Sequence, residues 1–186
     1  FILYNNRLAG ISDDRESITM LDLTDNKKPA KRTLHEEGIY PMKATFISDG
    51  NRIAVLYSDS IIRSYITKVP NSTGPSPYRA SVLKVPVDAY SGISSDTKQR
   101  LSAWSGNRVF FFTTENTSCT SFSVSFDTTV IDVSFIDSVT ALVQLKSGLV
   151  IADLRSQKTI RYKNYKTPLS CWSYSAAKKL FAFVES

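Results

Sequence analysis

The chain repeats one order of short apolar segments and polar turns, and this repetition restricts its fold more than any other feature. Over residues 42–67, and again over residues 130–164, an apolar segment is followed by a polar turn, a second apolar segment, another turn and a third segment. Apolar or alternating runs of about four to eight residues between turn residues are typical of β-strands. We therefore expect an all-β chain that uses one small unit several times.

The clearest unit covers residues 129–166. The segment 139–145 is almost entirely apolar, as in a strand with both faces buried. Lys146-Ser147-Gly148 follows it as a turn, with Gly where a positive φ is favoured. The four strands of this unit are expected over residues 130–136, 139–145, 149–155 and 158–164.

A second clear unit covers residues 38–87, and its Asp49-Gly50 pair is a signal for a tight hairpin turn. Its four strands are expected over residues 42–47, 52–57, 61–67 and 79–85. Weaker copies fill the rest of the chain, and the third of the five units has no obvious fourth strand. The units are expected over residues 1–37, 38–87, 98–127, 129–166 and 168–186, of which the last is incomplete.

Units of this length are typical of β-propeller blades, which have about 40–45 residues. The expected fold is an all-β β-propeller of four-stranded antiparallel blades. The chain reads as an excerpt of a larger propeller, for which we expect seven blades. The alternative is a β-sandwich or barrel with strands at similar spacing, but such a fold has no reason to repeat the same order of strands and turns.

Two segments resemble the third strand of a blade in the WD-repeat (tryptophan–aspartate) family. The segment LVIADLRS at 149–156 has Ala152-Asp153 at the place of that family's Trp-Asp pair, and ITMLDLT at 18–24 has Leu21-Asp22 there. Asp49-Gly50 and the segment 59–63 also follow the family's pattern. No Trp-Asp dipeptide occurs, and no Gly-His pair begins a unit. The resemblance implies propeller blades and no particular protein.

Composition sets broad limits on location and partners. The net charge of +6 is mild and suits an acidic protein, RNA or no charged partner. No run of about 18 or more apolar residues occurs, so no membrane span is expected. Cys119 and Cys171 are too few for a disulfide framework, which favours an intracellular protein, cytoplasmic or nuclear. Asn71-Ser72-Thr73 and Asn116-Thr117-Ser118 match the N-glycosylation pattern and keep a secreted or luminal protein open.

The sequence lacks the residue sets that catalysis and cofactor binding need. His35 is the single histidine, and the two cysteines do not have metal-ligand spacing. No glycine-rich phosphate-binding pattern occurs. We therefore expect no enzyme, no cofactor, no bound metal and no small-molecule substrate.

Two basic segments supply the candidate partner-binding residues. Residues 27–32 place four cations at the entry to an outer strand, and residues 158–166 interleave cations with tyrosines on another outer strand and its exit. Cations beside aromatic rings suit nucleic acids. An acidic protein or phospholipid surface suits the same charges, and Lys on an edge strand also prevents aggregation. The candidates are Lys27, Lys28, Lys31, Arg32, Lys158, Arg161, Tyr162, Lys163, Tyr165 and Lys166.

Two polar segments are candidate contact loops, because long polar loops on a rigid frame often carry binding. One is the proline-containing loop with Pro70, Pro75, Pro77 and Tyr78, and the other is the linker 88–98. The function expected from these features is that of a non-catalytic scaffold, a subunit of an intracellular multi-protein complex whose partners are other proteins. The alternatives are an RNA-associated subunit of a ribonucleoprotein, which would use the basic and Tyr-containing outer strand, and a secreted or luminal glycosylated receptor-type propeller.

Overall fold

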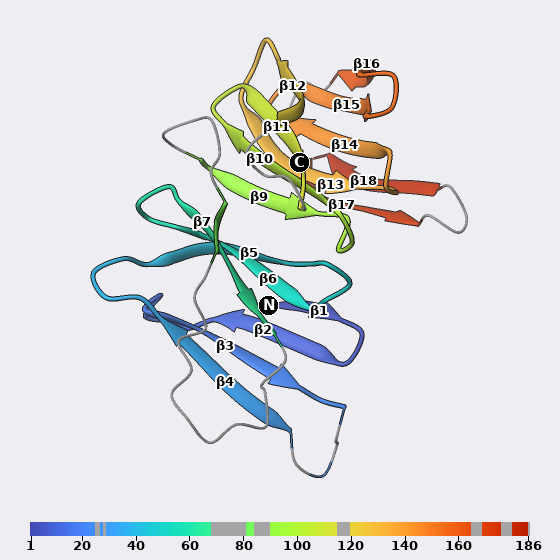
Figure 1. The fold of residues 1–186 in the computed structure, drawn as a ribbon. Helices are drawn as coiled ribbons and strands as arrows, with labels where there is room; N and C mark the ends of the chain where they lie inside the picture. The colour runs from blue at the N-terminus through green and yellow to red at the C-terminus, as the bar shows by residue number, and fades with distance from the viewer. Residues whose placement is uncertain are drawn as a thin grey trace.

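The structure is a computed structural model that describes residues 1–24, 27, 29–67, 81–83, 90–114, 120–164, 169–175 and 180–185. Within these residues the chain forms β-strands and no helix. The strands make four antiparallel sheets of four strands and a fifth sheet of two (Figure 1). The all-β expectation and the antiparallel four-stranded units are therefore confirmed.

Each sheet is a meander, because strands that follow one another along the chain are paired side by side. The first sheet contains β1 (Ile2–Tyr4), β2 (Arg7–Ile11), β3 (Ser17–Asp22) and β4 (Ala30–His35). The second contains β5 (Pro41–Ile47), β6 (Arg52–Tyr57), β7 (Ile62–Ile66) and β8 (Ser81–Leu83). The third contains β9 (Gly92–Ser95), β10 (Arg100–Ser105), β11 (Arg108–Thr113) and β12 (Thr120–Ser125). The fourth contains β13 (Val130–Phe135), β14 (Thr140–Leu145), β15 (Gly148–Asp153) and β16 (Lys158–Asn164), and the fifth contains β17 (Leu169–Ser175) and β18 (Leu180–Glu185).

One expectation about the third sheet was wrong. The segment 88–98, expected as a linker, contains β9, which pairs with β10 through Trp104↔Gly92 and Ala103↔Ile93. The unit expected to lack a strand is therefore a complete four-stranded meander. The strand is short and contains glycine and serine, which have low β-propensity, so its sequence gives little indication of it.

Successive sheets pack face to face on apolar layers. One layer lies between the first and second sheets, another between the second and third, and another between the third and fourth. A β-sandwich has two layers of sheet, whereas four sheets are stacked here. The described residues therefore do not form a β-sandwich.

The β6 strand shows how the second sheet packs against both the first and the third sheet. Its side chains alternate in direction, as the period of two in a strand requires. Ile53 and Val55 pack toward the first sheet, whereas Ala54 and Leu56 pack toward the third. All four are fully buried. A nearly continuous apolar run is the sequence expected for a strand that is covered on both faces.

Aromatic residues fill the layers on both sides of the third sheet. Phe110 and Phe112 face the second sheet, and Trp104 and Phe111 face the fourth. Burying each such side chain contributes about 1.5–3 kcal/mol relative to leaving it exposed. The third sheet thus holds its neighbours on both sides through its largest residues.

The sheets approach one another most closely at their first strands. The β5 strand contacts β1 and β9, and β9 contacts β13. The outer strands β4 and β16 lie at opposite ends of the stack (Figure 1). The turns that follow β1, β5, β9 and β13 share one side, here called the first-turn face (residues 5–6, 48–51, 96–99 and 136–139).

The two Asp residues that the WD-repeat resemblance singled out form turns. The Asp22 carboxylate accepts a hydrogen bond from the backbone N–H of Thr24 (3.0 Å), and Asp153 accepts those of Arg155 (2.8 Å) and Ser156 (3.1 Å). The pKa of Asp22 is lowered chiefly by the hydrogen bond from the Thr24 side chain, and the pKa of Asp153 by that from the Ser156 backbone. Both Asp residues thus hold the turn that leads to the outer strand.

The described residues contain no helix that is long enough and apolar enough to cross a membrane.

Candidate interaction site

A polar groove opens on the first-turn face, between turns of three successive sheets. It has a volume of about 370 Å³. Asp49 comes from the β5–β6 turn, Asp96 and Lys98 from the β9–β10 turn, and Ser138 from the β13–β14 turn. We call this site the turn groove, and it is lined by Asp49, Asp96, Lys98, Gln99, Arg100, Ser138 and Val139.

The β5–β6 turn has an unusual backbone that the sequence only partly indicates. Ser48, Asp49 and Gly50 all have positive φ, at 54°, 54° and 74°. The N–H of Gly50 binds the carbonyl of Ile47 (3.1 Å), and that of Asn51 binds the carbonyl of Ser48 (3.0 Å). These are two overlapping turns with positive φ at both central residues, the form that suits the twist of a hairpin.

Hydrogen bonds from the first sheet also hold this turn. Arg7 donates from Nη1 to the carbonyl of Gly50 (2.7 Å), and the Tyr4 hydroxyl donates to Asp49 Oδ1 (3.4 Å). A Cβ at Gly50 would come within 2.5 Å of the Tyr4 ring. Glycine at this position therefore permits both the positive φ and the close approach of a ring from the neighbouring sheet.

Two backbone hydrogen bonds join the β5–β6 turn to the β9–β10 turn. Ser48 N–H donates to the Lys98 carbonyl (2.7 Å), and Asp49 N–H donates to the Thr97 carbonyl (2.8 Å). Beside them, the Ser95 hydroxyl lies 2.9 Å from the hydroxyl of Thr45. Because the bonds use main-chain atoms, they fix the relative position of the two turns whatever side chains the turns carry.

Asp96 organises the β9–β10 turn from within. Its Oδ1 accepts the backbone N–H groups of Lys98 (2.8 Å) and Arg100 (2.8 Å). Its Oδ2 is buried and has no hydrogen-bond partner within the described part of the chain. Thr97, which lies between Asp96 and Lys98 in the chain, has a φ of 66°, which a β-branched residue rarely adopts. Strained positions of this kind cluster at binding and active sites.

The basic candidates on β4 have separate environments. Lys31 and Arg32 are neighbours on this strand, so their side chains point to opposite faces of the first sheet. Arg32 donates from Nη1 to the carbonyl of Ile66 in the second sheet. Lys31 is exposed, as is Lys27 in the preceding turn. Arg32 is thus already used to join two sheets.

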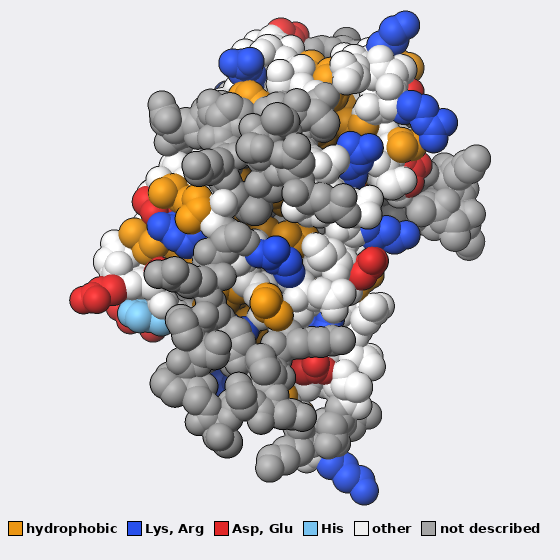
Figure 2. Space-filling view, viewed as in Figure 1, with side chains coloured by type: hydrophobic (Ala, Val, Ile, Leu, Met, Phe, Trp, Pro, Cys, Tyr) orange, Lys and Arg blue, Asp and Glu red, His pale blue; other side chains and the backbone are white. Residues whose placement is uncertain are grey.

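The basic candidates on β16 belong to the fourth sheet, at the other end of the stack from β4 (Figure 1). Lys158 is exposed at the start of this strand. The backbone of Arg161, Tyr162 and Lys163 continues it, and the structure does not describe their side chains. On the side seen in Figure 2, the coloured Lys and Arg side chains are spread over the length of the molecule. The structure thus does not bring the two basic segments together.

The remaining candidate residues lie outside the described residues. They are Lys28, Tyr165 and Lys166 of the basic segments, Pro70, Pro75, Pro77 and Tyr78 of the contact loop, and both glycosylation triplets.

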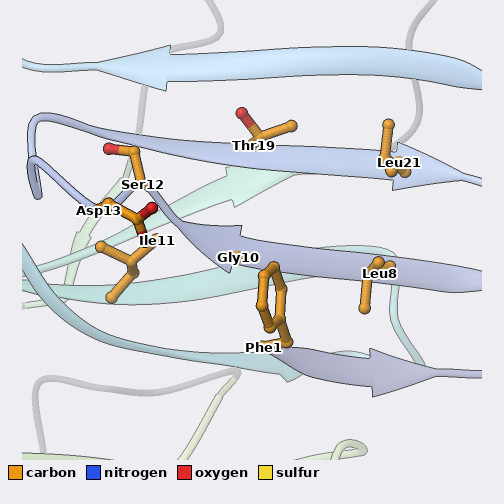
Figure 3. Close-up of a pocket in the computed structure, with 8 residues that line it drawn as sticks. All are labelled: Phe1, Leu8, Gly10, Ile11, Ser12, Asp13, Thr19 and Leu21. Atoms are coloured by element: carbon orange, nitrogen blue, oxygen red, sulfur yellow. The ribbon is translucent and has the colours of Figure 1, made fainter.

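A second, apolar groove lies on the face of the first sheet that turns away from the second sheet (Figure 3). Phe1 is almost fully exposed, and its ring covers Gly10, where a Cβ would come within 2.5 Å of it. Leu8 and Leu21 line the groove beside it, and it has a volume of about 230 Å³. The described residues give no indication of what covers this face.

Among the described residues, no cluster of three or more His, Cys, Asp or Glu side chains occurs that could hold a metal. His35 is exposed, and its Nδ1 lies 3.0 Å from the carbonyl oxygen of Glu16 on the adjacent turn.

The sequence matches no protein-family model and no curated protein. Sequence reasoning missed the turn groove, because its residues come from three turns that are each ordinary by themselves. The available signal was the recurrence of Asp49, Asp96 and Asp137 in the turn after the first strand of three units.

Proposed function

We propose that this chain is part of a β-propeller, for which seven blades are expected, and that the propeller is a non-catalytic scaffold in an intracellular multi-protein complex. The stacked four-stranded meanders support the propeller, because meanders arranged with their first strands adjacent are the form that blades take. Closure of the ring would cover the free sheet faces at the two ends of the stack.

The observation that carries the scaffold proposal is the pair of backbone hydrogen bonds between the β5–β6 and β9–β10 turns. A turn that is held by its neighbour loses little conformational freedom when a partner binds. Binding at the first-turn face would therefore need little ordering of the protein. This is the property expected of a surface that positions other proteins.

The proposal is tested by isolating the tagged full-length protein from its native cells, with and without nuclease treatment. A scaffold predicts the same set of proteins, in fixed stoichiometry, from both samples at moderate salt. The RNA-associated alternative predicts that the set is lost after nuclease treatment, because phosphate contacts dominate such binding.

A matched variant sharpens this test. Lys31→Glu combined with Lys158→Glu reverses two exposed cations, one on each of the outer strands β4 and β16. The scaffold proposal predicts that the complex is unchanged in this variant. Loss of the complex in both the nuclease experiment and this variant would overturn the scaffold proposal in favour of nucleic-acid binding.

A further inference from the structure

We propose that the turn groove binds a short acidic peptide segment of a partner protein, with one carboxylate held between Lys98 and Arg100. This inference rests on the proposed scaffold function and states the chemistry of one of its contacts. It concerns a different surface from the basic outer strands that the sequence suggested.

The two cations of the groove are available to a ligand. Lys98 is exposed and Arg100 is partly buried. Within the described part of the chain, neither side chain makes a hydrogen bond, and no ion pair within 4.0 Å joins either to an acid. A carboxylate is the natural partner for a guanidinium beside an ammonium group, because both can donate charge-assisted hydrogen bonds to it.

The carboxylate of Asp96 is a fixed part of the groove and not a contact for the ligand. Its Oδ1 accepts the backbone amides of Lys98 and Arg100, and its Oδ2 is buried. Asp96 therefore holds the backbone that carries the two cations, and the cations are left to contact the peptide.

The carboxylates in the turn groove disfavour a ligand that carries many negative charges. Asp49 is exposed at one wall of the groove, and Asp96 lies at another, so the site holds two carboxylates beside its two cations. One isolated carboxylate fits this balance. A nucleic-acid backbone, which carries a charge on every phosphate, would meet repulsion from both Asp residues.

The size and rigidity of the groove fit a short segment. A volume of about 370 Å³ is near the lower end of the range for ligand pockets, so it holds a few side chains of an extended segment and not a folded domain. Thr97 has a φ of 66° in one of the turns that form the groove. Such strain persists only where the surroundings fix the backbone, so the walls are formed before a ligand arrives.

The test selects peptides from a phage-displayed library of random peptides on the purified full-length protein and measures the affinity of the selected sequences by fluorescence anisotropy. The expected result is an enriched motif with Asp or Glu at one fixed position. Arg100→Gln and Lys98→Gln should each weaken binding by about tenfold, because each removes one charge-assisted interaction. Lys146→Gln, which changes an exposed lysine on the β14–β15 turn away from the groove, should leave the affinity unchanged.

A charge exchange separates recognition from folding. Arg100→Glu should lose the selected peptide and regain affinity for the same peptide with Lys at the acidic position, while its thermal unfolding stays close to that of the wild type. Failure to enrich an acidic motif, binding that Arg100→Gln does not weaken, or preferential binding of a labelled single-stranded RNA would each overturn the inference. If any of these occurs while the native complex survives nuclease treatment, the groove assignment fails and the scaffold function stands.

Discussion

The indole of Trp104 occupies the space that a side chain at Gly92 would need. The two residues are direct cross-strand partners on β10 and β9. A Cβ built on Gly92 would lie 2.2 Å from Cζ2 of the indole, and Trp104 is itself buried against the fourth sheet. Gly92 thus allows the largest side chain of the third sheet to cross its first strand.

Gly92→Ala is therefore expected to destabilise the fold by about 2–4 kcal/mol, because the indole cannot move without disturbing a packed layer. Urea unfolding followed by Trp fluorescence measures this change. The control is Gly10→Ala, where the three atoms nearest to the added Cβ all belong to the ring of Phe1. Phe1 is 99% exposed and can rotate away, so this variant should cost less than about 1 kcal/mol. Equal losses in the two variants would show that the contact at Trp104 is not rigid.

Gly92 and Trp104 show why some strands could be predicted from the sequence and β9 could not. The strands of the second and fourth sheets were correctly located, because Val, Ile and Leu recur between turn residues. The β9 strand was missed because Gly92 and the serines after it are poor strand formers. Its position is set by Trp104, twelve residues later in the chain, and a tertiary requirement of this kind leaves no local pattern.

The turn groove was unpredictable for a related reason. Asp49-Gly50 was recognised as a turn, but its hydrogen bonds to Thr97 and Lys98 depend on how two sheets stack. Asp96 lay in the segment expected as a linker. Charges from separate turns form a site only after the sheets have packed, so sequence spacing does not reveal it.

Tyr65 lies between the buried hydroxyl of Tyr57 and the carboxylate of Glu36 and hydrogen-bonds with both. Its hydroxyl donates to Glu36 Oε1 (2.7 Å) and lies 2.8 Å from the hydroxyl of Tyr57, which therefore donates to Tyr65. Burial raises the pKa of both hydroxyls, so both remain protonated where exposed tyrosines ionise.

Tyr65→Phe is expected to cost about 2 kcal/mol, because it leaves the buried Tyr57 hydroxyl without an acceptor. Tyr57→Phe should cost about 1 kcal/mol, since the bond from Tyr65 to Glu36 survives. Chemical denaturation of the two variants gives the comparison directly. A larger loss for Tyr57→Phe than for Tyr65→Phe would contradict this arrangement, in which Tyr57 donates to Tyr65 and Tyr65 donates to Glu36.

Lys43 and Asp132 bridge two sheets that are separated by β9. Lys43 Nζ on β5 lies 3.0 Å from Asp132 Oδ1 on β13 and 4.5 Å from the centre of the Trp104 ring. Lys43→Met and Asp132→Asn should show a coupling of about 0.5–1 kcal/mol in a double-mutant cycle, as expected for a partly exposed pair.

The matched control cycle replaces Lys43 by Lys146, which lies in the β14–β15 turn. Lys146→Met and Asp132→Asn should be additive within about 0.3–0.5 kcal/mol. Zero coupling in the Lys43 cycle would show that the ion pair with Asp132 contributes nothing to stability.

Asp59 and Arg63 form an ion pair that is held by two hydrogen bonds. Its two oxygens accept hydrogen bonds from Arg63 (3.0 and 2.7 Å), and the Arg63 guanidinium also lies 5.0 Å from the centre of the Tyr57 ring. The hydrogen bond from Arg63 is the main cause of the lowered pKa of Asp59. Because the folded-state pKa is lowered, the stabilisation is present above the unfolded-state pKa of about 3.9 and is lost as the pH falls through the folded-state value.

Asp59→Asn should therefore lower the free energy of unfolding by about 1 kcal/mol at neutral pH and by progressively less below about pH 4. Urea titrations at a series of pH values measure the convergence of the variant and the wild type. The control is Asp13→Asn, which replaces an exposed carboxylate on the β2–β3 turn and should change the free energy of unfolding at neutral pH by less than about 0.5 kcal/mol. A difference between Asp59→Asn and the wild type that stays constant down to about pH 2 would show that the loss comes from packing and not from the charge on Asp59.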